Sequence, residues 1–138
     1  GIGDIFSARI AGNFVNDDIL GSMEFACKLA GTKLIVVLGH TACGAVKGAC
    51  DDAKLGKLTG MLEKIKPAVN SVSEPEDPNL RNSSNIEFVN KVAEKNVHLT
   101  IDKIKADSEV LAAMVKNNEI KIVGGMYDIQ SGAVTFYE

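Results

Sequence analysis

The segment from Leu38 to Ala45, with the sequence LGHTACGA, holds the residues best suited to chemistry. His40 and Cys43 lie three positions apart, at a spacing that lets an imidazole and a sulfur point at one ion. These are donors that Zn²⁺ prefers in proteins. Gly44, directly after the cysteine, lets the backbone come close to a metal or a small substrate. The segment therefore predicts a zinc site with His40 and Cys43 as ligands and Gly44 as a substrate contact.

A competing interpretation stays open at this point. A lone His-x-x-Cys arises often by chance, so such a short motif is only a hypothesis. Two donors also do not hold zinc, which takes three or four ligands. The position of the pair along the chain is therefore the next evidence to weigh.

The elements around this segment favour a ligand site. Residues 33–38 form a continuous apolar run that predicts a strand buried on both faces. A helix is expected to begin near Thr41 and to continue through Ala49, which places Cys43 in its first turn. The partial positive charge of a helix N-terminus favours a thiolate there. Ligands of parallel sheets bind at this corner between strand and helix.

The rest of the chain predicts an α/β protein with a mainly parallel sheet flanked by helices and a C-terminal hairpin. We expect one domain over residues 1–138, and apolar spacing gives its elements. Further strands are predicted at 5–10, 120–127 and 133–137; helices at 19–30, 58–65, 86–106 and 108–117; and a polar loop at 71–85.

Other residues with chemical potential receive plainer interpretations. Cys27 lies on an apolar helix stripe and is expected to be buried and inert. Cys50 lies two helical turns beyond Cys43, too far to share its metal. His98 is expected to be exposed, and Arg9, among apolar neighbours, is the better candidate for a buried ion pair. Tyr127 is compatible with either a pocket lining or the core.

Composition excludes several classes of partner. With 15 Lys and Arg against 18 Asp and Glu, the net charge is -3, so no basic excess drives nucleic-acid binding. No apolar run approaches the roughly 20 residues of a membrane span. Three cysteines without an export signal favour a reducing, cytoplasmic compartment.

Four segments, in order along the chain, resemble motifs of the β-class carbonic anhydrases. Residues 1–13 look like G-x-G-D-x-F…R-x-A-G-N, and residues 21–26 look like G-S-x-E-[YF]-A. Residues 36–45 look like the second zinc motif, G-H-x-x-C-G, and residues 123–134 look like the closing hairpin. Four ordered matches are far more specific than one His-x-x-Cys.

The resemblance implies a fold, an activity and an assembly. Members of this family bind one Zn²⁺ through two cysteines and one histidine, and His40 and Cys43 would be two of those ligands. Zinc-bound hydroxide attacks CO2, and bicarbonate and a proton are released, which is the reaction of a lyase. The family also works as a homodimer or a higher homo-oligomer, with CO2 and bicarbonate as its small-molecule partners.

One family motif has no counterpart here. The first zinc motif, C-x-D-S-R, precedes G-x-G-D in the family and supplies the third thiolate and a catalytic Asp/Arg pair, so no catalytic residue can be named. The same stretch carries a central strand between those expected at 5–10 and 33–38, and its loss would leave a groove with unpaired backbone groups.

Three interpretations remain. We expect that the natural protein is longer and that the missing motif lies upstream of Gly1, because the other segments keep the family pattern. A short form that holds no zinc and acts only as an oligomer-forming module is the alternative. A hydrolase of CS2 or COS on the same scaffold is the third.

Overall fold

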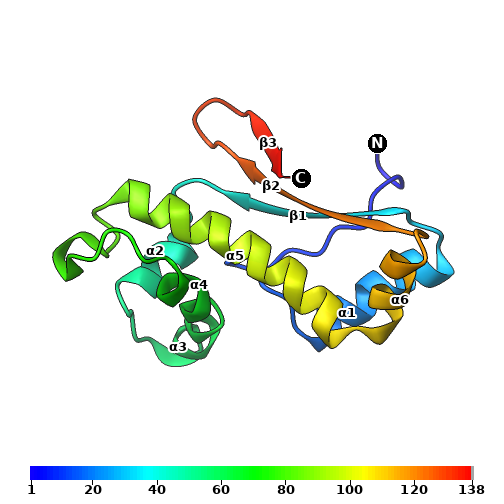
Figure 1. The fold of residues 1–138 in the computed structure, drawn as a ribbon, viewed down its shortest axis with the longest axis horizontal. Helices are drawn as coiled ribbons and strands as arrows, with labels where there is room; N and C mark the ends of the chain where they lie inside the picture. The colour runs from blue at the N-terminus through cyan, green and yellow to red at the C-terminus, as the bar shows by residue number, and fades with distance from the viewer. Residues whose placement is uncertain (138) are drawn as a thin grey trace.

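The computed structural model describes residues 1–137, which form one small sheet with helices packed against it (Figure 1). In chain order the elements are α1 (Asp17–Glu24), η1 (Phe25–Leu29), β1 (Leu34–His40), α2 (Gly44–Cys50), α3 (Gly56–Glu63), α4 (Lys66–Ser71), η2 (Pro78–Leu80), α5 (Ile86–Asp107), α6 (Glu109–Lys116), β2 (Lys121–Tyr127) and β3 (Val134–Tyr137).

The sheet has the order β1-β2-β3. β1 and β2 pair in parallel, so that His40 lies opposite Tyr127, and β3 returns antiparallel to β2 as a hairpin. This arrangement confirms the predicted α/β class, with its parallel strands and C-terminal hairpin. It also brings the end of β1 beside the hairpin, where the predicted site lies.

The long helix α5 crosses one face of the sheet (Figure 1). Strand glycines let it come close: a Cβ added at Gly39 or at Gly124 would lie 2.8 Å from a methyl of Val97. Two buried clusters meet along this helix, one with α2, α3 and α4 and the other with the sheet, α1 and α6. The helix begins at an Asn85 cap, whose side chain accepts from the Phe88 amide.

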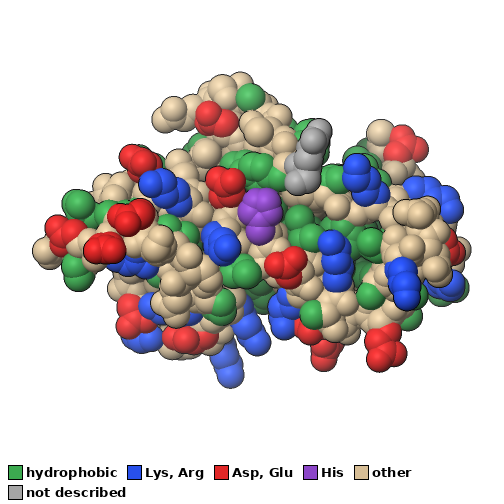
Figure 2. Space-filling model, viewed as in Figure 1, with side chains coloured by type: hydrophobic (Ala, Val, Ile, Leu, Met, Phe, Trp, Pro, Cys, Tyr) green, Lys and Arg blue, Asp and Glu red, His purple; other side chains and the backbone are tan. Residues whose placement is uncertain are grey.

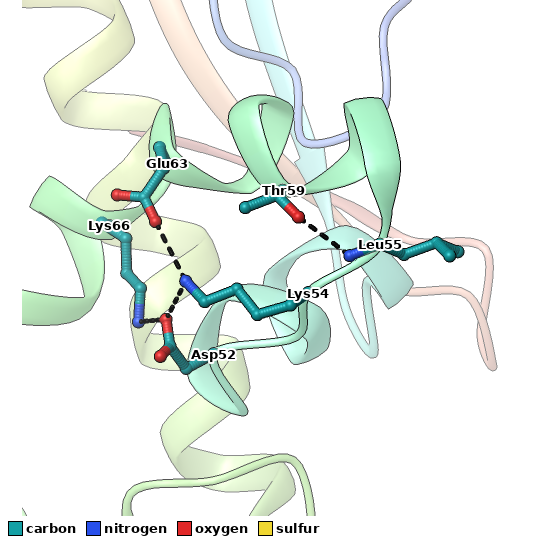
Figure 3. A network of polar contacts seen from close by, with 6 residues as sticks. All are labelled: Asp52, Lys54, Leu55, Thr59, Glu63 and Lys66. Atoms are coloured by element: carbon teal, nitrogen blue, oxygen red, sulfur yellow. Dashed lines mark hydrogen bonds and ion pairs between the residues drawn. The ribbon is translucent and has the colours of Figure 1, made fainter.

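A polar network ties the short helices together (Figure 3). The Asp52 carboxylate accepts from Lys54 at 3.0 Å and from Lys66 at 2.8 Å, and Lys54 also reaches Glu63 at 3.5 Å. The hydrogen bond from Lys66, with that from Lys54, lowers the pKa of the Asp52 carboxyl. One exposed carboxylate therefore links the turn after α2 to α3 and α4.

The polar loop after α4 is organised by one guanidinium group. Arg81 donates to the carbonyls of Val72 at 2.7 Å, Pro75 at 3.0 Å and Val69 at 3.0 Å. Its guanidinium also lies 4.8 Å from the centre of the Phe88 ring. Arg81, rather than Arg9, is therefore the arginine built into the fold.

Two expectations about local structure were wrong. Residues 5–10 form no strand, because within residues 1–137 they have no strand to pair with. The helix expected from Thr41 begins at Gly44, because Ala42 has a φ of 51°, which no right-handed helix accepts. Between the helix expected at 58–65 and the loop expected at 71–85, the structure adds the short helix α4, which begins at Lys66 and holds Pro67 in its first turn, where proline is tolerated.

The remaining side-chain expectations have mixed outcomes. Arg9 is exposed and makes no ion pair within the described residues, so the buried pair was wrong. Cys27 is buried as predicted, and desolvation raises the pKa of its thiol. His98 is exposed as predicted, and Tyr127 is exposed enough to line a groove.

Positive and negative side chains are not segregated on the face shown in Figure 2. Basic and acidic side chains are interspersed there, and hydrophobic side chains gather near the middle. Among residues 1–137, none of the helices is both long and apolar enough to cross a membrane.

Candidate metal centre

The predicted site residues lie on one sharp corner of the chain. His40 is the last residue of β1, Cys43 is the N-cap of α2, and Gly44 is the first residue of that helix. Between them, Thr41 and Ala42 form a tight turn. Cys43 thus precedes the helix instead of lying in its first turn, and α2 has only seven residues.

The turn that follows β1 orients the His40 ring. His40 Nδ1 lies 2.9 Å from the Thr41 carbonyl oxygen. A carbonyl oxygen can only accept, so Nδ1 carries the proton and donates it. In the neutral ring the lone pair is then on Nε2, on an exposed side chain, which is the arrangement that a metal-binding histidine needs.

The cysteine is held differently. Cys43 is only 6% exposed and packs with the cluster formed around α2 and α5. Its side chain makes no capping hydrogen bond, so the sulfur has no competing partner at the helix start. Around Gly44, a Cβ would meet no atom within 4 Å, which leaves open space beside the cysteine.

Both donors line the same groove. A hollow of about 460 Å³ is lined by His40, Cys43 and Gly44 on one side and by residues 8–13, including Arg9, on the other. A second hollow of about 600 Å³ shares Arg9, Asn13 and His40 with it and continues along β1. The groove therefore lies between β1 and residues 7–15, in the place that the resemblance indicated.

The donor set fits zinc in kind but not in number. An imidazole and a thiolate are both zinc ligands, and His40 and Cys43 line the same groove. Residues 1–137 hold no cluster of three His, Cys, Asp or Glu side chains placed for a metal ion. This part of the chain thus accounts for two donors of a site that takes three or four.

The third cysteine does not join them. Cys50 ends α2 and is absent from the residues that line the groove. Burial and, next, the neighbouring Asp51 raise the pKa of its thiol to about 11. Cys50 is therefore a protonated thiol near neutral pH, and it lies away from the residues that line the groove.

Tertiary hydrogen bonds hold the corner in place. The Thr41 amide donates to the Tyr127 carbonyl at 3.0 Å, and Thr41 Oγ1 accepts from the Ile129 amide at 3.1 Å. From the other side, Asn90 Oδ1 of α5 accepts from the Ala42 amide at 2.9 Å. Ala42 needs such support, because a left-handed conformation costs an L-residue roughly 1–2 kcal/mol.

Sequence reasoning missed these supporting side chains. Asn90 lies 48 residues from its partner, and no local pattern links the two. Asn96 and Thr100 are equally remote: Asn96 donates to the Gly12 carbonyl at 2.6 Å and Thr100 to that of Asn13 at 3.3 Å. One signal was available, since polar residues at buried positions of α5 need partners.

Sequence comparison now defines the class of protein. A family model described as carbonic anhydrase matches residues 1–134, and the chain therefore belongs to the carbonic anhydrase family. It is 31% identical over 137 residues to Carbonic anhydrase 2 of Mycobacterium tuberculosis (strain H37Rv), covering 96% of this chain and 62% of that protein. The chain thus spans about three fifths of that relative's length.

A shorter match has a different name. Over 52 residues the chain is 40% identical to a carbon disulfide hydrolase of Acidithiobacillus thiooxidans, which covers 38% of this chain and 24% of that protein. The full-length similarity is to carbonic anhydrases.

Solved structures confirm the expected β-class fold. The β-carbonic anhydrase CafA of Aspergillus fumigatus superposes with a TM-score of 0.83 at 24% identity, covering 99% of this chain and 65% of that one. A tetrameric β-carbonic anhydrase of Sordaria macrospora gives 0.80 at 23% identity, covering 99% and 69%. At these identities the likeness shows the fold.

Proposed function

We propose that the protein catalyses the reversible hydration of CO2 to bicarbonate and a proton, with zinc as cofactor. The observation that carries the proposal is the shared groove: His40 and Cys43 both line it, at the end of β1, in a chain of the carbonic anhydrase family. The third ligand and the groups that move the proton are left to residues outside 1–137.

Each site residue has a defined task in this proposal. His40 presents Nε2 because its Nδ1 proton is donated to the Thr41 carbonyl. Cys43 supplies a thiolate from a position that is nearly closed to water. Bound zinc would act as a Lewis acid that activates water for attack on CO2. The open space at Gly44 admits a small substrate beside the two donors.

Substitution of the two donors tests the proposal. In the full-length protein, His40→Ala and Cys43→Ser are each expected to lower zinc content below one per chain. Stopped-flow CO2 hydration should fall by at least about a hundredfold, since second-shell changes alone cost 10–100-fold. Cys50→Ser is the matched control, because that cysteine lies off the groove. Unchanged zinc content and hydration in both donor variants would overturn the proposal.

The same assay distinguishes the remaining alternatives. A CS2 hydrolase, suggested by the 52-residue match, would turn over CS2 faster than CO2. An oligomer-forming module without catalysis would hold substoichiometric zinc and hydrate no CO2 even at alkaline pH. We favour CO2, because the matches that span nearly the whole chain are to carbonic anhydrases.

We also propose that the protein forms a homo-oligomer, a dimer or larger. The sheet face opposite α5 exposes large apolar side chains, which soluble monomers rarely gather in one patch. Leu38 and Phe136 lie together there, since a Cβ at Gly125 would be 3.3 Å from each. Sedimentation of the full-length protein would decide this, and a monomer at micromolar concentration would contradict it.

We also propose a cytoplasmic location for the protein. Its cysteines Cys27, Cys43 and Cys50 are free thiols, which fit the reducing compartment expected from the sequence.

A further inference from the structure

Ala42 has an unusual conformation for its residue type. Its φ is 51°, in the left-handed region. The other non-glycine residues of positive φ among residues 1–137 are Asn13, Asp52 and Asn118. Asparagine and aspartate tolerate this region, because their short polar side chains bond locally, whereas alanine has no such group. The conformation at Ala42 is therefore imposed by the surroundings.

The imposing contact comes from α5. Asn90 Oδ1 accepts from the Ala42 amide at 2.9 Å, in a partly buried bond between residues 48 positions apart. Without this acceptor the Ala42 N–H would lose its partner away from bulk water, which is unfavourable. The bond therefore favours the strained turn over a relaxed one.

The strained residue lies between the two donors. On one side, His40 is fixed by β1, because it lies opposite Tyr127 in the ladder, and the Thr41 amide donates to the Tyr127 carbonyl. On the other side, Cys43 follows Ala42 directly and precedes α2. A change of φ at Ala42 would redirect the chain at Cys43 while His40 stayed in the ladder.

We infer that Asn90 is a positioning residue: by holding Ala42 in the left-handed conformation, it sets Cys43 against His40 in the shared groove. The inference deepens the proposed function and rests on it for the role of the pair as metal ligands. The positioning itself is a property of the chain, measurable without metal.

Three variants of the full-length protein test the inference. Asn90→Ala removes the acceptor, Asn90→Asp keeps an oxygen at the same place, and Asn90→Ala combined with Ala42→Gly removes the strain that the bond opposes. Asn82→Ala is the control, since within residues 1–137 the Asn82 side chain bonds to its own loop, donating to the Asn79 carbonyl and accepting from the Ser84 amide.

The readouts are zinc affinity by chelator competition, the visible spectrum of the Co²⁺-substituted protein, and hydrogen exchange of the Ala42 amide. We expect Asn90→Ala to weaken zinc binding about tenfold, to change the cobalt bands and to speed exchange. Asn90→Asp and the double variant should each recover most of the affinity, and Asn82→Ala should match the wild type.

If the wild-type protein binds metal, two results would overturn the inference. One is zinc affinity and cobalt bands in Asn90→Ala that equal those of the wild type. The other is a loss in Asn90→Ala that neither Asn90→Asp nor the double variant restores, which would indicate general damage to the fold. If the wild-type protein binds neither metal, the proposed function is wrong. Exchange at Ala42 then decides the positioning alone: unchanged exchange in Asn90→Ala overturns it, and faster exchange supports it.

Discussion

The two extended segments that border the groove are held in different ways. β1 pairs with β2 and turns Ile35 and Val37 toward the buried cluster under α5. Residues 5–10 are largely exposed, and within residues 1–137 none of their amides donates a hydrogen bond. Both segments have sequences typical of strands. The difference therefore teaches that a segment forms a strand only when a neighbouring strand is available to pair with it, whatever its β-propensity.

The unpaired segment is nevertheless anchored at its end. Asn96 donates to the Gly12 carbonyl, and the Phe14 and Val15 side chains are buried directly after it. The segment before it is held more loosely, by the packing of Phe6 on Phe25 and of Ile10 on the buried cluster. One wall of the groove thus stays in place while the amides of residues 5–10 donate no hydrogen bond within residues 1–137. The predictions below test this contrast, beginning with the largest effect.

Hydrogen exchange should separate the two segments most clearly. Amides of β1 that bond to β2 are expected to exchange only through large-scale opening, whereas amides of residues 5–10 should exchange almost as in an unfolded chain. The expected ratio of protection factors is at least about a thousandfold. Comparable protection in isolated residues 1–138, measured by NMR, would contradict the contrast.

A matched pair of substitutions should separate the two faces of β1. Val37 is 5% exposed and Val36 is 43% exposed. Val37→Ala is expected to lower the free energy of unfolding by about 1.5–3 kcal/mol, because it removes packing under α5. Val36→Ala should change it by less than about 0.5 kcal/mol. Equal losses in denaturant titrations of residues 1–138 would show that both faces are covered.

Because α5 packs closely on β1, even a methyl group added at Gly39 is expected to lower the stability of the protein. In Gly39→Ala the new Cβ would lie 2.8 Å from Val97 and 3.2 Å from Met126, so atoms must shift, at about 1–3 kcal/mol. Gly60→Ala, inside α3 with no atom within 4 Å, is the control and should stabilise by roughly 0.5–1 kcal/mol. Thermal unfolding of both variants measures the difference, and a neutral Gly39→Ala would refute close packing.

The smallest effect is expected far from both segments. The pKa of Asp52 is lowered in the folded protein from an ordinary 3.8 by its hydrogen bonds to Lys66 and Lys54. Its stabilising contribution is therefore present above pH 3.8 and is lost as the pH falls through the lower, folded value. Asp52→Asn should be slightly less stable than the wild type at pH 7, and the difference should vanish once the pH has fallen below the folded pKa of Asp52. A difference that persists in acid would point to another cause.

Local sequence patterns correctly predicted the elements whose formation depends on the residues of that same segment. The apolar run before Gly39 predicted β1, and apolar spacing predicted α5. The spacing of His40 and Cys43 predicted donors that line one groove, although whether they bind zinc stays a prediction.

The failures share a physical cause, which is dependence on distant groups. Within residues 1–137, residues 5–10 have no strand to pair with, and Arg9 has no anionic partner for the buried ion pair that was expected of it. Asn90 was missed because its partner is remote in sequence, and the turn at Ala42 was missed because that contact imposes it. Each outcome depends on tertiary structure rather than on residue type.

The glycine at the end of β1 gives α5 a second role. Gly39 lets β1 pack closely against Val97. Asn90, seven residues earlier on the same helix, accepts a hydrogen bond from the turn before Cys43. α5 therefore contacts the strand that ends at His40 and the turn that precedes Cys43, at points about 10 Å apart along its axis. A shift of α5 relative to the sheet would act on the turn at Ala42, while the pairing of β1 with β2 holds His40 in place.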